Sequence, residues 1–168
     1  MSVTSLKPSA SDRFANICLE TLSELEKNTL VALAISALAP GYLKEPLTSP
    51  DASRNYLQLN HAKYKNEVFG CLFLTNNHQL IAEEQLFFGT IDGASVHPRV
   101  VVQKVLEHNA SAVIFWHNHP SGKASISSSD KTITCKLKEA LALVDVRVID
   151  HIVIGTEETS SFAEQGYL

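Results

Sequence analysis

Two histidines and an aspartate are the residues of this chain that are best suited to chemistry. His117 and His119 follow directly after the apolar run 112–116, where a buried strand is expected to end. Residues two apart in a strand point to the same side, so both imidazoles can offer a nitrogen lone pair to one cation. Asp130 adds an oxygen ligand if the loop after Gly122 turns back. Such a ligand set leaves the fourth tetrahedral position to water, which is typical of catalytic zinc.

The spacing of these residues resembles the signature of the JAMM (JAB1/MPN+) metalloproteases. That signature is His, any residue, His, seven residues, Ser, two residues and Asp, with a glutamate well upstream. Here Ser127 stands at the serine position and Glu67 lies upstream. From about residue 45 to 168 the chain is closer still to the bacterial RadC-like branch of that family. The matching positions are Gly89 with Thr90, His97 with Pro98 and Arg99, the run 117–122, Asp150 with His151, and Ser161 with Phe162.

The resemblance implies a zinc-dependent peptidase or isopeptidase that acts on a protein or peptide substrate. The two histidines and Asp130 would hold Zn²⁺, which lowers the pKa of bound water and polarises the substrate carbonyl. Glu67 would be the general base that passes a proton to the leaving amine, and Ser127 would stabilise the oxyanion. The chain departs from the branch at Trp116, where a small residue is usual. We expect this large ring beside the metal, where it would narrow the cleft.

Each of these residues also has a structural interpretation. Ser127 and Asp130 can be the N-cap and a first-turn acid of a helix, and Ser127 can both cap and assist catalysis. Glu67 can be a solvent-facing strand residue. His97 and His151 either line the cleft and orient ligands or are purely structural, and both alternatives stay open. The remaining histidines are expected at the surface or in a satisfied core: His61, His78 and His108.

Apolar periodicity predicts the elements that must position the site. Helices are predicted over 47–60, over 99–108 and after Ser127, and strands over 67–75, 80–88, 112–116 and, singly or as a pair, 146–154, with a last short strand starting at Ser161. Asn76 and Asn77 are expected to turn the first two strands into a hairpin. The predicted fold class is therefore α/β: a mixed β-sheet flanked by helices, with an N-terminal helical extension. The JAB/MPN fold, with its deaminase-like layout, agrees with it.

The predicted domain organisation is a tail and helical extension over 1–44, followed by the catalytic domain over 45–168. An amphipathic helix is expected from Ser11, interrupted at 27–28, with an apolar stretch over 29–38. These N-terminal helices either bind a partner, including a second copy in a homodimer, or pack on the catalytic domain. The region is expected to be too short for a tandem helix-hairpin-helix DNA-binding module.

Composition limits the function classes. With 168 residues, 45% hydrophobic and 19% charged, the chain suits one globular domain. It lacks an apolar run long enough to span a bilayer, so we expect a cytoplasmic protein with no membrane partner. A formal charge of −4 does not support a nucleic-acid partner. The cysteines are odd in number and far apart, and we expect buried thiols at Cys18, Cys71 and Cys135.

Two other functions are alternatives to a peptidase. An accessory DNA-repair or defence-associated protein would keep the metal site but act by binding partners, and a basic stripe, which the sequence lacks, would favour it. A zinc deaminase would need a glutamate two residues after the histidine and a paired-cysteine motif, and neither is present.

Overall fold

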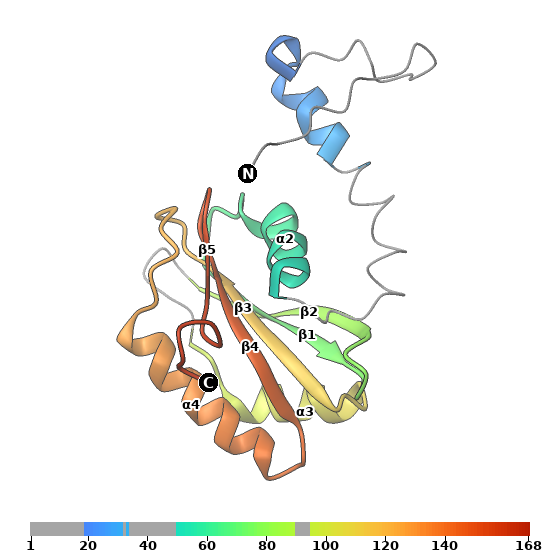
Figure 1. Cartoon of the computed structure of the whole chain (residues 1–168), viewed down its shortest axis with the longest axis vertical. Helices are drawn as coiled ribbons and strands as arrows, with labels where there is room; N and C mark the ends of the chain where they lie inside the picture. Colours follow the sequence, from blue (N-terminus) through green and yellow to red (C-terminus); the bar gives the residue numbers. More distant parts are fainter. Residues whose placement is uncertain (1–18, 32, 34–49, 90–94) are drawn as a thin grey trace.

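The computed structural model describes residues 19–31, 33, 50–89 and 95–168. A five-stranded mixed sheet in the order β2-β1-β3-β4-β5 forms its centre (Figure 1). The strands are β1 (Val68–Leu74), β2 (Leu80–Phe88), β3 (Ala112–Asn118), β4 (Arg147–Ile154) and β5 (Thr159–Ser161). The helices are the short 3-10 helix η1 (Leu19–Thr21), α2 (Pro50–His61), α3 (Pro98–Glu107) and α4 (Ser128–Ala142). The predicted α/β fold class, a mixed sheet flanked by helices, is confirmed.

The first two strands form the predicted hairpin. β1 pairs antiparallel with β2, and the turn between them is closed by the Thr75 N–H, which donates to the Gln79 carbonyl at 2.9 Å. β1 lies between β2 and β3, and every one of its residues is buried, as expected for an apolar run covered on both faces. The hairpin therefore supplies a rigid strand beside the one that carries the histidines.

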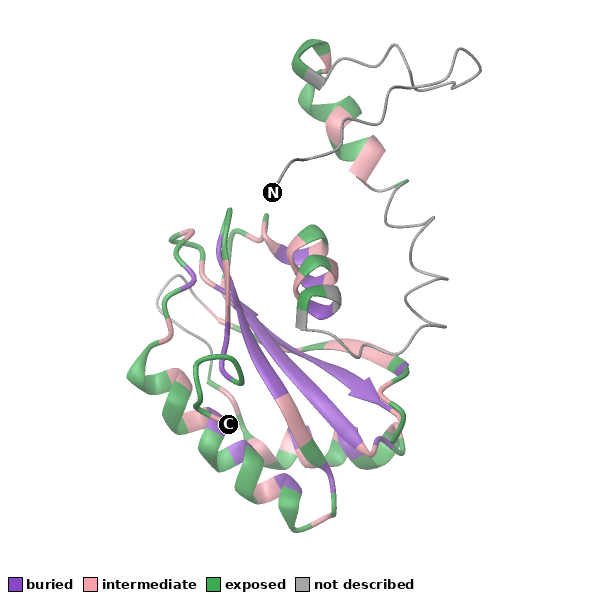
Figure 2. Cartoon of the chain, in the orientation of Figure 1, coloured by how far each residue is buried: buried purple, intermediate pink, exposed green. Residues whose placement is uncertain are grey.

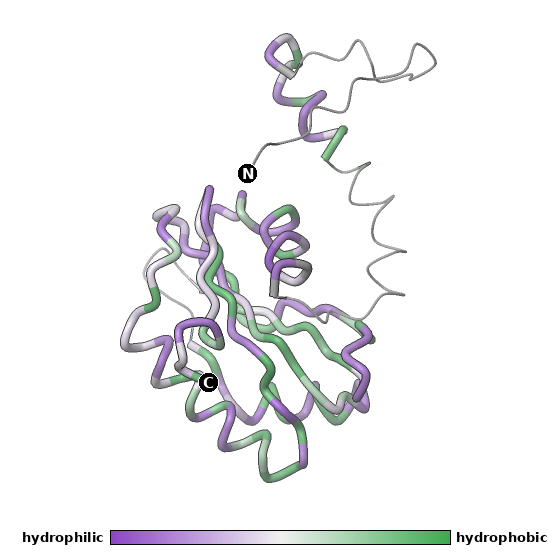
Figure 3. Tube along the Cα trace, in the orientation of Figure 1, coloured by the Kyte–Doolittle hydropathy of each residue, from purple (hydrophilic) through white to green (hydrophobic). Residues whose placement is uncertain are grey.

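Helices cover both faces of the sheet. Leu57 of α2 packs into the apolar cluster on one face, while Val105 of α3 and Leu137 of α4 belong to the cluster on the other face. Figure 2 shows buried strands between helices that are buried only in part, and in Figure 3 the central strands are the most hydrophobic segments. α4 links the parallel strands β3 and β4, so its first turn lies near the end of β3.

Trp116 lies on the opposite face of β3 from His117, and the expectation that its ring stands beside the metal is wrong. The ring is fully buried and stacks on His61 with centroids 3.9 Å apart. It also covers Gly70, where an added Cβ would come within 2.3 Å of the indole. Consecutive residues of a strand point to opposite faces, so a neighbour of a ligand along the chain is not its neighbour in space.

The described part of the N-terminal extension is helical over residues 24–31, without the interruption predicted at 27–28. The break lies earlier, at Ser23. The Ser23 N–H donates to Glu26 Oε2 at 2.8 Å, and the Glu26 N–H donates to Ser23 Oγ at 3.4 Å. This reciprocal capping starts a new helix. The predicted start at Ser11 and most of the stretch 29–38 lie outside the described residues.

Three smaller predictions are resolved by the structure. Residues 147–154 form one strand rather than a pair, and the last strand ends at Ser161 instead of starting there, because it pairs with the end of β4. Cys71 is buried as predicted, but Cys135 is exposed because the buried stripe of α4 runs through other positions. Cys18 lies outside the described residues.

In the described part of the chain, no helix combines the length and apolar character needed to cross a membrane.

Candidate metal centre

The end of β3 brings the two predicted histidine ligands together. His117 is buried, 2% exposed, on the face of the sheet that α3 and α4 cover. His119 lies just beyond the strand, and its N–H donates to the Ile154 carbonyl at 2.9 Å, which continues the pairing with β4. The Nε2 atoms of His117 and His119 are 3.0 Å apart. The same-side geometry predicted for residues two apart is thus present.

The first turn of α4 brings Asp130 to the same point. Ser127 is the N-cap: its Oγ accepts from the Asp130 N–H at 3.1 Å, and Asp130 Oδ2 accepts from the Ser127 N–H at 2.7 Å. The second carboxylate oxygen, Oδ1, lies 3.5 Å from His117 Nε2. The capping role that was one alternative for both residues is therefore real. It also turns one oxygen of Asp130 toward the histidines.

These three side chains form a donor set that fits a zinc ion. His119 Nδ1 lies 2.8 Å from the Lys123 carbonyl and donates to it, so in the neutral ring the lone pair that could bind a metal is on Nε2. The two Nε2 atoms and one Asp130 oxygen lie within 4.8 Å of one another. Tetrahedral zinc with bonds of about 2.0–2.1 Å places its ligand atoms roughly 3.3 Å apart. The separations of 3.0 Å between the two histidine nitrogens and 3.5 Å between His117 Nε2 and Asp130 Oδ1 are close to that value, and the third pair lies within 4.8 Å.

Glu67 and Ser127 line the same pocket as the three candidate ligand residues. The pocket has a volume of about 500 Å³. Glu67 stands one residue before β1, on the same face as Phe69, whose partner across the sheet is His117. The pocket is lined by Glu67, Phe69, Ser95, Val96, His117, His119, Ser127, Ser129, Asp130, Ile133 and His151. All five residues predicted for the site therefore meet at one cavity.

Asn118 holds the segment that leads to Glu67. Its side chain is buried, and Oδ1 accepts from the Val68 N–H at 2.9 Å. Its Nδ2 donates to the carbonyls of Asn66 at 3.1 Å and Tyr64 at 3.3 Å. Asn118 thus ties the end of β3 to the residues on both sides of Glu67. The sequence gives one sign of this role, a polar residue that continues a buried apolar strand.

His151 of β4 lies behind His117. Its Nε2 is 2.8 Å from His117 Nδ1, and its Nδ1 is 2.6 Å from Thr134 Oγ1. Thr134 in turn donates to the Asp130 carbonyl at 2.6 Å. Burial lowers the pKa of His117 to about 4, and it lowers the pKa of His151 well below its ordinary value. Both rings are therefore neutral near pH 7, and a neutral ring is what metal ligation requires.

The structure gives different surroundings to His97 and His151, the two histidines whose roles the sequence left open. His151 contacts a predicted ligand, whereas His97 is the N-cap of α3, makes no capping hydrogen bond with its side chain and faces the ring of Phe87. The sequence interpretation missed Thr134. Its position four residues after Asp130 puts both on one face of α4, and a polar residue on the buried stripe of that helix was the available signal.

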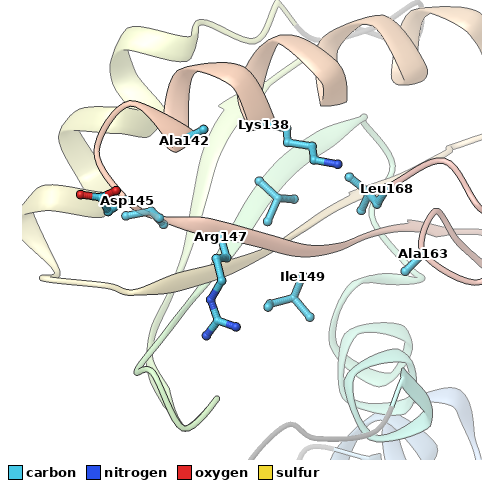
Figure 4. A pocket seen from close by; sticks show the side chains of 9 residues that line it. Lys138, Ala142, Asp145, Arg147, Ile149, Ala163 and Leu168 are labelled. Carbon is cyan, nitrogen blue, oxygen red and sulfur yellow. The ribbon is translucent and has the colours of Figure 1, made fainter.

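A second pocket of about 620 Å³ lies at the far end of α4 and β4. It is lined by Lys138, Ala142, Asp145, Val146, Arg147, Val148, Ile149, Ala163 and Leu168. Lys138 projects from α4 and Arg147 from β4, in different directions (Figure 4). No histidine lines it, so the chemistry predicted from the sequence belongs to the smaller pocket.

Comparison with known proteins agrees with this architecture. Residues 47–167 match the RadC-like JAB domain family. The chain belongs to this family. The JAB superfamily includes metalloproteases, so a metal site at the end of β3 is compatible with membership. The match covers β1 to β5, the helices between them and α2.

Several curated proteins of the same family are similar to the chain. A UPF0758 protein of Nitrosococcus oceani is 59% identical over 122 residues, which cover 73% of this chain and 54% of the relative. One of Azotobacter vinelandii is 54% identical over 132 residues, 78% of this chain and 59% of the relative. One of Vibrio cholerae is 50% identical over 144 residues, 85% and 91% of the two chains. The chain thus spans about half the length of the first two.

Proposed function

We propose that this RadC-like JAB domain is a zinc-dependent metallopeptidase or isopeptidase that hydrolyses an amide bond of a protein or peptide substrate. One observation carries the proposal: ligand atoms of His117, His119 and Asp130 converge in a pocket that Glu67 and Ser127 also line. Metal ligands, a carboxylate and a hydroxyl in one cavity are the groups that hydrolysis by activated water needs.

The residues of the pocket have distinct roles in this proposal. Zinc, when bound by the two histidines and Asp130, supplies a Lewis acid that activates water and polarises a carbonyl. Glu67 accepts a proton from the attacking water and delivers it to the leaving amine. Ser127 Oγ accepts from the Asp130 N–H, so its own hydroxyl proton can be donated to the oxyanion.

Apolar residues complete the pocket. Phe69, Val96 and Ile133 line it together with the polar groups. Such side chains exclude water from one side of the reacting bond, which strengthens the electrostatic interactions inside. A pocket with both apolar and polar groups suits an extended peptide whose backbone reaches the polar groups.

Metal content is the first test. We expect about one zinc per chain after purification without added metal, and little in a His117→Ala/His119→Ala variant. A His78→Ala/His97→Ala variant is the matched control, because it also loses two histidines but no ligand. A native chain that carries no zinc, and whose melting temperature does not change when zinc is added, would refute the proposal.

Hydrolysis is the second test. The zinc-loaded chain is mixed with peptides and with isopeptide-linked peptides, and cleavage is followed by mass spectrometry. We expect cleavage that a chelator abolishes and zinc restores. Zinc binding without cleavage of any substrate in either set would leave a metal site but contradict the peptidase.

A further inference from the structure

We propose that a hydrogen-bond relay through His151 holds His117 in the one neutral tautomer that can bind a metal. The relay runs from the backbone carbonyl of Asp130, through the Thr134 hydroxyl and the His151 ring, to His117 Nδ1. This inference rests on the proposed function, because it concerns how the metal site is prepared. It makes Thr134 and His151 positioning residues.

The direction of the relay is set at Thr134. A carbonyl oxygen can only accept, so the 2.6 Å contact with the Asp130 carbonyl uses the single hydroxyl proton of Thr134. The same Oγ1 lies 2.6 Å from His151 Nδ1, and there it must accept. His151 Nδ1 therefore carries a hydrogen.

Burial decides what the other nitrogen of His151 does. The ring is 0% exposed and lies among the rings of Phe69, Phe115 and Phe162. An imidazolium ion there would be desolvated at high cost, so the ring is neutral and its Nε2 has a lone pair. That lone pair, 2.8 Å from His117 Nδ1, can only accept. His117 therefore donates from Nδ1.

His117 is then left with a lone pair on Nε2, the atom that faces His119 and Asp130. In the opposite tautomer Nε2 would carry a hydrogen, which would have to leave before a metal could bind. The relay also joins two of the three proposed ligands, because it starts on the backbone of Asp130 and ends on His117. Ligands on β3 and α4 are thereby fixed relative to one another through β4.

Substitutions at Thr134 test the relay directly. Thr134→Val keeps the shape of the side chain but removes the acceptor for His151 Nδ1–H. His151 can then place its hydrogen on Nε2 and donate to His117 Nδ1, which reverses both tautomers. We expect zinc affinity, measured by competition with a chromophoric chelator, to fall about 10- to 100-fold, the usual effect of losing an outer-shell partner.

Two variants serve as controls. Thr134→Ser keeps the hydroxyl and should retain the native zinc affinity within about threefold. Thr132 makes the same kind of bond on the same helix, from its hydroxyl to the Ser128 carbonyl at 2.9 Å, but it is exposed. Thr132→Val should therefore bind zinc as the native chain does. Equal losses in Thr132→Val and Thr134→Val would show a general helix effect and overturn the relay.

Nitrogen-15 NMR of the metal-free native chain gives a readout that does not depend on zinc or on how the variants fold. We expect His117 and His151 both to carry hydrogen on Nδ1. Hydrogen on Nε2 of His117 would overturn the relay, as would native zinc affinity in a folded Thr134→Val chain. A chain that binds zinc but cleaves nothing would contradict the peptidase and leave the relay intact. If the native chain binds no zinc, the NMR result alone decides the relay.

Discussion

At the scale of single residues, the two carboxylates of the pocket are constrained in different ways. Asp130 is held at one oxygen by the Ser127 N–H, and its other oxygen lies 3.5 Å from His117 Nε2, turned toward the histidines. Glu67 lines the pocket just before β1, between two residues whose backbone Asn118 holds. A carboxylate fixed by a helix cap suits a ligand, and a second carboxylate in the same pocket suits a group that carries protons between water and substrate.

Replacement of Glu67 by Gln should separate these roles. The amide has the same size but cannot accept and release a proton, so we expect hydrolysis to fall by a factor of about 10²–10⁴. Zinc content should stay at the native level, since the ligands are unchanged. Steady-state cleavage and metal analysis of the same preparation check both statements.

Glu157→Gln is a suitable control, because Glu157 is exposed and lies outside the pocket. An active Glu67→Gln chain would remove the general base from the mechanism. Loss of zinc in that chain would make Glu67 a ligand instead.

At the scale of elements, the junction between β1 and β3 decides where Glu67, the proposed general base, stands. Asn118, between the two histidines, faces away from the pocket and holds the backbone on either side of Glu67. The run from His117 to His119 therefore supplies two proposed metal ligands with its outer members and positions Glu67, the proposed base, with its central one. Strand alternation makes this division possible.

Asn118→Ala should reduce both stability and turnover. It leaves the buried Val68 N–H without its partner, which costs about 1–3 kcal/mol, and it removes the amide donor from two part-buried carbonyls. We expect a lower urea midpoint and a lower kcat, with zinc affinity changed by less than about threefold. Urea titration and metal competition check these outcomes.

Asn60→Ala is the matched control. It removes one side-chain hydrogen bond, from Asn60 to the Tyr56 carbonyl within α2. It should leave kcat unchanged. A tenfold loss of zinc affinity in Asn118→Ala would show that Asn118 acts on the histidines rather than on Glu67.

The close packing of Gly70 in β1 against Trp116 predicts that a larger residue at this position lowers stability. In Gly70→Ala the new Cβ would stand 2.3 Å from an indole ring that is itself stacked on His61. We expect the free energy of unfolding to fall by about 1–3 kcal/mol, as for other overpacked cores. Adding Trp116→Phe should restore part of it, and a Gly70→Ala chain that unfolds like the native one would contradict the packing.

Strand periodicity was sufficient to predict the sheet, its hairpin and the shared face of the two histidines. The expectation for Trp116 was wrong because it took adjacency along the chain for adjacency in space, whereas strand periodicity puts Trp116 and His117 on opposite faces. The contact of His151 with His117 could not be predicted in the same way. It depends on the register of parallel strands, Phe115 opposite His151, and no local pattern encodes a register between segments joined by a helix.

Helix periodicity has a similar limit at Cys135 and Thr134. Both lie between apolar residues of α4, and the burial of one rather than the other follows from how the helix is rotated against the sheet. The side of a helix that faces the core is decided by packing, and adjacent positions differ by about 100°. The sequence could mark Thr134 as a polar residue on the buried stripe, but its contact with His151 depends on that rotation.

At the scale of the whole molecule, the site lies where three elements meet: the end of β3, the start of α4 and the segment before β1. Two of its histidines are buried and neutral, which links the stability of the fold to pH. In the unfolded chain a histidine has a pKa of about 6.5. Burial lowers the pKa of His117 to about 4 and that of His151 well below its ordinary value.

The metal-free chain should therefore lose stability as the pH falls below about 6.5. In that range the unfolded chain binds protons that the folded chain does not, so protonation favours unfolding. Each histidine contributes up to about 1.4 kcal/mol per pH unit. Urea midpoints at pH 7, 6 and 5 measure the effect before most carboxylates titrate. Equal midpoints at pH 7 and pH 5 would show that these rings are not held neutral.

The capping box at the start of α4 also bears on the entropy of metal binding. A flexible acidic side chain loses rotamer freedom when it becomes a ligand, and that loss weakens binding. Asp130 loses this freedom when the helix forms, because Ser127 already holds one of its oxygens. Little ordering of this ligand is then left for the binding step. If the chain binds the proposed zinc, we expect the metal to enter and leave the folded chain without melting of the helix, at a rate independent of unfolding.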